Sequence, residues 1–514
     1  MSLKRCITLP FFAVSLFALQ GKAQDKPETK PNTAGKPKAE SPASLLRLDV
    51  DSAVTTKHSV TIKGIPVAYT ATAGTIPIWD EDGKPVAGVF YTYYERDNVK
   101  DRDSRPLVIS FNGGPGTPSL WMEIGYTGPR MLKIDDEGYP VLPYGLQDNP
   151  NSILDIADIV YLDPVNTGYS RKTDKETPNT KFYGVNEDIA YLADWINTFV
   201  TRKNRWASPK FLIGESYGTT RASGLALALQ QREWMFLNGV VLVSPTELGI
   251  ERNGPLAAAL RLPYFSATAW YHKKLPADLQ SQDLTAFLPT VEKYAIDELL
   301  PAIAKGNSIS AEERAKVVGQ FARYTGLDTS VISGNNLDVS TDVYWKELLK
   351  KEGYTIGRLD SRYKGIDKQA YGSSPDYNAE LESWSNAFTP AMNIYLRNEL
   401  NYKTDIHYNI FGSVRPWNNK NNQVAENLRL AMASNPNLHL LVQSGYYDGA
   451  CDYFNAKYSM WQMDPRGVLL SRMKWEGYRS GHMLYLRKED RETSTENLRK
   501  FIQSSLNLGK SIKY

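Results

Sequence analysis

A serine in a tight turn, Gly214-Glu215-Ser216-Tyr217-Gly218, constrains the fold of this chain more than any other feature. The apolar run 211–213 precedes the turn, and the helix-compatible segment TTRASGLALALQ follows it. A continuous apolar run is typical of a strand buried on both faces. Small residues on both sides of a serine allow the sharp strand-to-helix turn that exposes a nucleophilic hydroxyl. We therefore predict that Ser216 is a nucleophile; the alternative is an ordinary turn with a capping serine.

Other apolar runs predict that this strand belongs to a larger sheet. Each run stops at a polar or glycine-rich turn, and together they cover residues 107–111, 159–162, 211–213 and 240–243. Residues 186–202, between the second and third runs, place apolar side chains at helical intervals. Strands alternating with helices imply a mostly parallel α/β sheet. From about Val60, β-branched and aromatic stretches bounded by glycine and aspartate predict an antiparallel β-meander before that sheet.

A long segment without strand-helix alternation follows Pro245. It contains helical patterns, including 284–303 and 311–323, mixed with aromatic and glycine-rich loops as far as about Asn435. The α/β pattern then returns in two strand-like runs and a closing helix, at residues 438–442, 468–475 and 495–506. A long excursion between returning strands predicts a large, partly helical cap inserted over the sheet. We therefore predict an α/β-hydrolase fold with helices on both faces of the sheet.

The first residues read as a secretory signal peptide. A basic start, the apolar run from Ile7 to Leu19 and small residues predict cleavage after Ala23. The alternative is a membrane anchor, which needs an apolar run of about 20 residues. Export to the periplasm or the medium is therefore expected, without stable membrane insertion after cleavage.

The patterns divide the chain into five segments. In order they are a signal peptide at 1–23, a disordered linker rich in Pro, Lys, Thr and Ala at 24–44, the first part of the hydrolase core at 45–245, the cap at 246–435, and the second part of the core at 436–514. With 514 residues, 42% of them hydrophobic, the chain is large enough to bury a sizeable core. We expect one domain that has grown by insertion.

Charge and cysteine content argue against several classes of function. Removing residues 1–23 takes Lys4, Arg5 and Lys22 from the 60 basic residues and leaves 57, against 57 acidic residues. This balance gives no reason to expect binding to nucleic acid or anionic membranes. Cys451 is then the single cysteine, expected to be a small buried residue, with a redox role as the alternative. No two histidines stand at ligand spacing, so we expect no metal and no cofactor. The sequence leaves the oligomeric state open.

A serine nucleophile needs a base, and four histidines follow Ser216 in the chain. In α/β-hydrolases the order is serine, acid, histidine. His439 lies in an apolar run and is expected to pack in a strand, while His272 and His407 fall in the predicted cap. His482 follows a strand in the small-residue loop SGHM, where an imidazole can project freely. His482 is therefore the predicted base, with a surface-loop histidine as the alternative.

The acid that orients this base should follow the preceding strand. The segment LHLLVQSGYYDGACD offers Asp448, directly in the turn after the strand, and Asp452. We predict that Asp448 completes the triad and that Asp452 caps a helix or lies in a loop. Backbone amides should stabilise the oxyanion. One should come from Tyr217 and the other from the glycine-rich turn 111–116, which lacks the lysine and spacing of a phosphate loop.

Several motifs together resemble the serine carboxypeptidase family (peptidase S10), the group that includes cathepsin A and yeast carboxypeptidase Y. They span nearly all of the predicted core in the family's order: FNGGPG at 111–116, GPR at 128–130, NPNSILDIADIVYLDPVNTGYS at 149–170, GESYG at 214–218, SGYYDGACD at 444–452 and SGHM at 480–483. The resemblance implies removal of single residues from the C-terminus of peptide substrates through an acyl-enzyme.

The resemblance also implies roles for individual residues. Gly114 and Tyr217 would form the oxyanion hole, and Asn112, Gly113 and Glu215 would bind substrate. Asn112 and Glu215 would hydrogen-bond the terminal carboxylate, which requires a protonated Glu215 because two carboxylates repel each other.

The chain departs from the family pattern beside these residues. Tyr126 occupies the position of a second glutamate that shares the proton in well-known members, and Glu123 is out of register with it. Thr117 replaces the usual cysteine after GGPG, and one mature cysteine cannot form the family's disulfides. Such departures resemble those of bacterial members. They motivate one alternative, a serine esterase or acyltransferase of the same fold; a non-catalytic binding protein is a further one, against which the intact triad argues.

Overall fold

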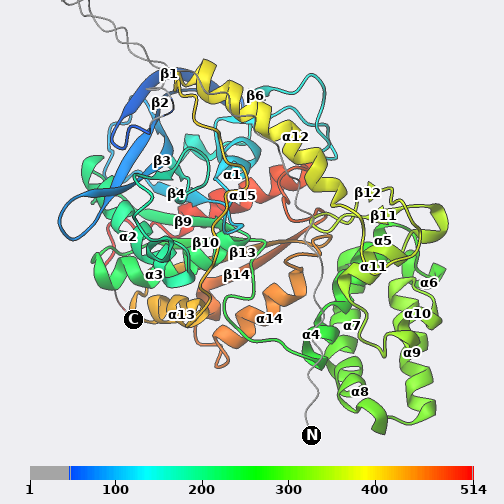
Figure 1. Cartoon of the computed structure of the whole chain (residues 1–514). Helices are drawn as coiled ribbons and strands as arrows, with labels where there is room; N and C mark the ends of the chain where they lie inside the picture. Colours follow the sequence, from blue (N-terminus) through cyan, green and yellow to red (C-terminus); the bar gives the residue numbers. More distant parts are fainter. Residues whose placement is uncertain (1–45, 47, 512, 514) are drawn as a thin grey trace, which may run out of the picture. The chain divides into compact units, whose positions relative to one another are not determined.

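Ten strands form one large sheet that organises the protein (Figure 1). Their order is β1-β2-β3-β7-β4-β9-β10-β13-β14, and the short β8 pairs with β3. The strands are β1 (Ala53–Ile62), β2 (Ile65–Trp79), β3 (Pro85–Arg96), β4 (Leu107–Phe111), β7 (Asp158–Leu162), β8 (Arg171–Lys172), β9 (Lys210–Glu215), β10 (Gly239–Val243), β13 (His439–Gly445) and β14 (Met473–Tyr478). Two separate pairs are β5 (Arg130–Leu132) with β6 (Leu146–Asp148) and β11 (Thr355–Ile356) with β12 (Lys364–Gly365).

Strand direction divides the sheet into two parts. The first three strands pair antiparallel and form the predicted meander, which joins β7 through an antiparallel β3. From β7 to β14 every neighbouring pair is parallel. The predicted mostly parallel sheet is therefore confirmed. The carboxyl ends of its parallel strands meet at one edge, where loops can bring distant residues together.

Helices cover both faces of this sheet. The computed structural model describes residues 46, 48–511 and 513, and within them the α-helices are α1 (Leu120–Met122), α2 (Val185–Arg202), α3 (Tyr217–Arg232), α4 (Pro255–Leu260), α5 (Leu262–Tyr271), α6 (Ala277–Gln280), α7 (Leu284–Tyr294), α8 (Leu300–Ala304), α9 (Ala311–Thr325), α10 (Thr329–Gly334), α11 (Thr341–Glu347), α12 (Ala379–Ile394), α13 (Val424–Ser434), α14 (Tyr453–Met463) and α15 (Lys488–Ser504). The predicted signal peptide and linker lie outside the described residues.

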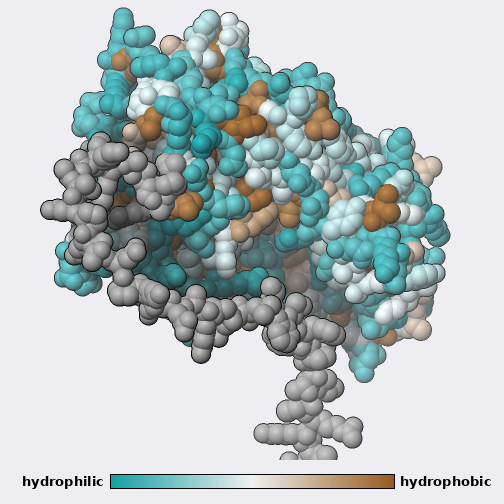
Figure 2. All heavy atoms as spheres, turned by 45° about the horizontal axis from the view of Figure 1, so that its top comes forward, coloured by the Kyte–Doolittle hydropathy of each residue, from teal (hydrophilic) through white to brown (hydrophobic). Residues whose placement is uncertain are grey.

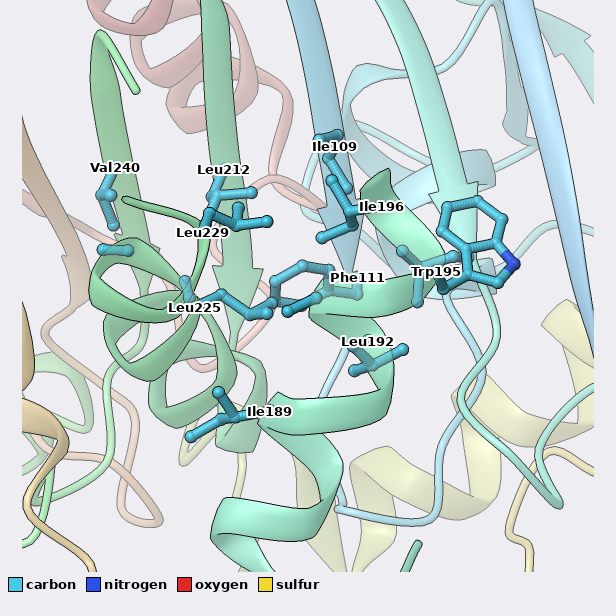
Figure 3. Packing of buried hydrophobic residues seen from close by; sticks show 14 of the residues in the cluster. Ile109, Phe111, Ile189, Leu192, Trp195, Ile196, Leu212, Leu225, Leu229 and Val240 are labelled. Atoms are coloured by element: carbon cyan, nitrogen blue, oxygen red, sulfur yellow. The ribbon is translucent and has the colours of Figure 1, made fainter. Parts of the chain in front are cut away.

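Side chains of one strand reach two different cores. Leu212 of β9 packs in the core formed with α2, α3, α13 and α14. Its neighbours Phe211 and Ile213 pack on the opposite face, in the core formed with α1, α12 and α15. Burial on both faces explains why the strand is a continuous apolar run. Figure 3 shows the first core, where strand side chains such as Ile109 and Leu212 meet side chains of α2 and α3.

The segment between β10 and β13 builds a third core of its own. Helices α5 to α11 form a group beside the sheet (Figure 1). Their buried side chains, such as Phe265, Leu288 and Phe321, pack with Tyr446 and Tyr447 from the turn after β13. The helical group therefore contacts the loop that carries the predicted catalytic acid.

Two predicted boundaries near the C-terminus were wrong. The run 468–475 is a strand only from Met473, because residues 470–472 form a 3-10 turn and the amide of Leu469 donates to Asp464 Oδ2. The closing helix begins at Lys488 rather than at residue 495. Its first turns are charged and lack apolar periodicity, yet they are held by side-chain hydrogen bonds, including one from Ser480 to Asp490.

The surface in Figure 2 is mainly polar, with hydrophobic residues in scattered patches on the face shown. Among the described residues, no helix combines the length and apolarity needed to cross a bilayer.

A buried glutamate makes stability depend on pH. Glu123 is 3% exposed and accepts a hydrogen bond of 2.5 Å from Tyr94 Oη. Burial raises its pKa from 4.5 to about 8. Because the folded state binds this proton more tightly than the unfolded state, the contribution of Glu123 is fully present below about pH 4.5. It is lost as the pH rises toward 8.

In the wild-type protein we expect the free energy of unfolding to fall between about pH 5 and about pH 8. In Glu123→Gln this fall should be smaller, by an amount on the order of a few kcal/mol. Urea unfolding at the two pH values measures it. Glu496→Gln is the matched control, because Glu496 is only partly buried and forms its ion pair with Lys63 at the surface. An unchanged difference between the two pH values in Glu123→Gln would contradict the prediction.

Candidate active site

Ser216 lies in a strained turn between β9 and α3. Its backbone has φ 58° and ψ −128°, and its N–H donates to the carbonyl of Val243 at 3.0 Å. A Cβ on Gly214 would lie 2.0 Å from the carbonyl oxygen of Gly218, so no side chain fits there. The turn thus needs its glycines for close packing, and a positive φ at a non-glycine residue marks a site held by its surroundings. This geometry is typical of an exposed serine nucleophile.

Asp448 and His482 meet because β13 and β14 are parallel neighbours. Asp448 follows β13, and His482 lies in the loop after β14. Nδ1 of His482 is 2.7 Å from Asp448 Oδ2, and the two residues are 4% and 0% exposed. The other carboxylate oxygen, Oδ1, accepts hydrogen bonds from the amides of Ala450 and Cys451 at 2.8 and 3.0 Å. Asp448 is therefore fixed, and it directs Nε2 of His482 away from itself.

The electrostatics of this pair favour a base. Burial opposes a charge on His482, but the attraction and hydrogen bond of Asp448 outweigh it, so the pKa of His482 lies above its usual value of 6.5. A backbone hydrogen bond of 2.6 Å from His482 N to the carbonyl of Leu359 also fixes the loop. The imidazole is thus held in one orientation and stabilised when it takes up a proton.

A cavity of about 600 Å³ gathers the predicted site residues. Ser216 and His482 line it, together with the remaining predicted residues Asn112, Gly113, Gly114, Glu215 and Tyr217. Asp448 stands behind His482, as an orienting acid should. The structure therefore brings every predicted catalytic and substrate-binding residue to one place.

The glycine turn after β4 packs directly on the serine turn. A Cβ on Gly113 would be 2.3 Å from the backbone nitrogen of Tyr217. This close approach places the two turns side by side at the cavity wall. Arg221 of α3 holds the arrangement, because its guanidinium donates to the carbonyls of Asn112 and Pro115 at 2.6 Å each. A buried ion pair of 2.5 Å with Asp188 fixes Arg221 in turn.

Glu215 is a buried carboxyl that forms no ion pair with a lysine or arginine among the described residues, although the nearby His482 favours its charged form. It is 2% exposed, and Tyr485 Oη donates to its Oε2. Burial raises the pKa of Glu215 from 4.5 to about 7. Beside it, Asn112 accepts from the amide of Met122 at 3.0 Å, while its Nδ2 is buried without a hydrogen-bond partner. The pair therefore offers a protonated carboxyl and a free amide donor to a ligand in the cavity.

Residues 65–492 match a family model described as serine carboxypeptidase. The chain belongs to the serine carboxypeptidase family. By class it is a serine-type carboxypeptidase, a hydrolase. Its sheet, surrounding helices and serine turn agree with the α/β-hydrolase fold expected from the sequence.

Individual relatives agree with this assignment. The chain is 29% identical to serine carboxypeptidase S10 family member 1 of Dictyostelium discoideum over 58% of this chain and 67% of that protein. It is 27% identical to the mouse lysosomal protective protein over 30% of each. The fold is similar to that of Kex1(delta)p, a prohormone-processing carboxypeptidase from Saccharomyces cerevisiae, with a TM-score of 0.54, 14% identity and coverage of 85% of this chain and 91% of that one.

Two tyrosines, Tyr126 and Tyr485, lie near Glu215. Tyr126 does not reach Glu215; its hydroxyl donates to Gln443 at 2.9 Å. Its ring stacks on Tyr485, with centroids 4.7 Å apart, and Tyr485 makes the hydrogen bond to Glu215. Glu123, which the sequence placed out of register, points to Tyr94 instead. The group that donates to Glu215 is therefore a phenol that stays protonated, Tyr485, rather than a second carboxyl.

The other candidates lie where the sequence placed them. Asp452 caps α14, accepting from the amide of Asn455 at 2.9 Å. His439 is the first residue of β13, and His272 binds the carbonyl of Ser361 at 2.7 Å. His407 is exposed and lies 3.2 Å from Asn409 Oδ1. None of these three histidines lines the cavity.

Cys451 lies beside the acid and the base. Ligand atoms of Asp448, Cys451 and His482 lie within 4.8 Å of one another, the spacing of a possible metal site among the described residues. Asp448 already binds His482 and two amides, however, and burial holds the pKa of the Cys451 thiol well above its usual value. A neutral thiol is a poor metal ligand and a poor nucleophile. The arrangement fits an orienting acid better than a ligand set.

Sequence reasoning missed three supporting residues of this family site. Tyr485 follows His482 by three positions, and Arg221 is one helical turn beyond Ser216, so proximity in the chain was the available signal. Arg358 lies in the segment between β11 and β12, far from any motif. Its neighbour Leu359 binds His482, which only the structure reveals.

Proposed function

We propose that this serine carboxypeptidase removes residues from the C-terminus of peptides through an acyl-enzyme on Ser216. His482 takes the hydroxyl proton as Ser216 Oγ attacks the carbonyl carbon of the last peptide bond. Asp448 orients the imidazole and stabilises its charged form. His482 then gives the proton to the leaving amine as the C–N bond breaks. Water, deprotonated by the same histidine, hydrolyses the ester.

Backbone amides of Gly114 and Tyr217 would stabilise the oxyanion. The close packing of Gly113 on the Tyr217 nitrogen supports this assignment, because it brings both turns to the same side of Ser216. The Arg221 clamp supports it as well, since an oxyanion hole must be rigid before the reaction begins.

The carboxyl group of Glu215 is the observation that carries exopeptidase function. A buried acid beside Ser216, with a pKa raised by burial to about 7, can donate a hydrogen bond to a substrate carboxylate instead of repelling it. The unpartnered Nδ2 of Asn112 supplies a second donor. Gly113 would complete this subsite through its backbone. Binding the free C-terminus here would place the last peptide bond at Ser216.

We also propose that the protein is exported to the periplasm or the medium after cleavage at Ala23. The basic, apolar and small-residue pattern of residues 1–23 supports export. Peptides reaching that compartment would be its substrates. We further propose that residues 246–435 act as a cap, which the helical core beside the acid turn supports.

Mass spectrometry of peptide digests tests the proposal. Peptides with a blocked N-terminus should be trimmed one residue at a time, and C-terminal amidation should block trimming because it removes the carboxylate. Ser216→Ala serves as the control for contaminating peptidases. If simple acyl esters are cleaved by way of Ser216 but no peptide is trimmed, the protein is an esterase or acyltransferase built on the same machinery.

A further inference from the structure

Three arginines line the cavity, and they differ in the ion pairs and hydrogen bonds that their side chains form. Arg261 forms an ion pair of 2.9 Å with Asp338. Arg252 lies 3.9 Å from Glu247 and also donates to Ser459. The side chain of Arg358 is exposed and makes no hydrogen bond or ion pair with any described residue. Arg358 is therefore the cavity arginine without a hydrogen bond or ion pair among the described residues, and its charge acts on the carboxylate of Glu380 only at longer range.

The acids of the cavity do not supply the missing partner. Glu247 faces Arg252. Asp452 is occupied as the cap of α14, and Glu215 is held by Tyr485. Glu380 lies beneath the Arg358 segment, where it accepts from the amide of Leu359 at 2.7 Å, and it is buried away from the cavity. An anion that enters the cavity would meet an arginine with all its donors free.

The backbone holds Arg358 next to the reacting groups. Its carbonyl accepts from the amide of Gly449, in the acid turn, at 3.0 Å. The next carbonyl, of Leu359, accepts from the amide of His482 at 2.6 Å. The segment therefore bridges the loops that carry Asp448 and His482, and Arg358 lines the cavity beside them.

We infer that Arg358 selects peptides with an acidic side chain at one of the two residues that flank the scissile bond. This inference rests on the proposed function. A glutamate or aspartate side chain would pair with the guanidinium through two parallel hydrogen bonds, which a neutral amide cannot match. Glu215 and Asn112 would meanwhile hold the terminal carboxylate, so the two anionic groups of the substrate have separate partners.

Matched substrate pairs test the inference. N-blocked peptides carry glutamate or glutamine, either as the last residue or as the one before it. The same pairs are made as depsipeptides, in which the scissile bond is an ester. The wild-type protein should prefer glutamate by about tenfold in kcat/KM at one of these positions. The position at which the preference appears identifies the subsite.

Variants assign the preference to the arginine. Arg358→Met should bring the glutamate-to-glutamine ratio to within about twofold of one, and Arg358→Lys should keep part of it. Arg261→Met should keep the wild-type ratio, because Arg261 is already paired with Asp338. The ratio compares two substrates on one variant, so partial misfolding cancels. A wild-type ratio near one at both positions, or an unchanged ratio in Arg358→Met, overturns the inference.

The two proposals fail in different ways. If depsipeptides are hydrolysed and peptides are not, the peptidase proposal falls, while the ratio measured on the depsipeptides still decides the role of Arg358. Calorimetric binding of the same pairs to Ser216→Ala protein gives the ratio without any turnover. The inference is supported if Ser216→Ala protein binds the glutamate compound with a lower Kd than the glutamine compound, and if this difference is lost in the double variant that also carries Arg358→Met. Equal Kd values for the two compounds in Ser216→Ala protein overturn it.

Discussion

Replacing Ser216 by alanine is expected to lower kcat/KM for both peptides and esters by about 10⁴-fold or more. In the proposed mechanism the hydroxyl forms the covalent intermediate, and no other described hydroxyl group replaces it at the strained turn between β9 and α3. Any remaining rate would come from substrate binding and oxyanion stabilisation alone. Steady-state kinetics on a blocked peptide and on its ester analogue measure the loss.

A serine on the same helix provides the matched control. Ser223 is buried in α3, and its hydroxyl has no hydrogen-bond partner, so alanine there removes no interaction. Ser223→Ala should keep full activity. His482→Ala should lose about as much activity as Ser216→Ala, and the double variant should lose no more than either, because the groups act as a unit. Additive losses, or an active Ser216→Ala protein, would place the chemistry elsewhere.

The sequence could predict the sheet because each parallel strand is buried on both faces. Runs such as 211–213 are apolar throughout since Phe211 and Ile213 face one core and Leu212 the other. Chain order and turn context singled out Asp448 and His482 from several acids and histidines, and the structure places these two residues in contact. The boundary of α15 was missed because polar contacts, not apolar periodicity, hold its first turns.

Closeness in the chain to His482 and Ser216 was a signal for Tyr485 and Arg221, but the contacts that give these residues their roles are far apart in the sequence. Tyr485 and Glu215 are separated by 270 positions, and Arg221 reaches back over 106 positions to Pro115. No local pattern marks such a pair. Arg358 is a still clearer case, since its place beside the triad depends on hydrogen bonds to two different loops. The proposed reacting groups thus lie in recognisable motifs, and the residues that contact them do not.

Peptide hydrolysis is expected to decline above about pH 7, while hydrolysis of substrates without a terminal carboxylate does not. Burial gives Glu215 a pKa of about 7 in the free protein. Below that pH the carboxyl is protonated and can donate to the substrate carboxylate; above it the two negative charges repel. Each further pH unit should lower kcat/KM for peptides by about tenfold. The matching ester or amide, which lacks the carboxylate, should instead rise with pH and level off as His482 loses its proton, because a base is active only when deprotonated.

Two variants of Glu215 and its partner separate this explanation from a general alkaline loss. Glu215→Gln keeps a donor at every pH, so it should remove the decline for peptides. Tyr485→Phe deletes the hydrogen bond that lowers the pKa of Glu215, and it should move the decline upward by about one pH unit. Tyr126→Phe is the control, because its hydroxyl binds Gln443 instead. If Tyr485→Phe leaves the profile unchanged while Glu215→Gln flattens it, burial alone sets the protonation of Glu215, and the hydroxyl of Tyr485 does not tune it.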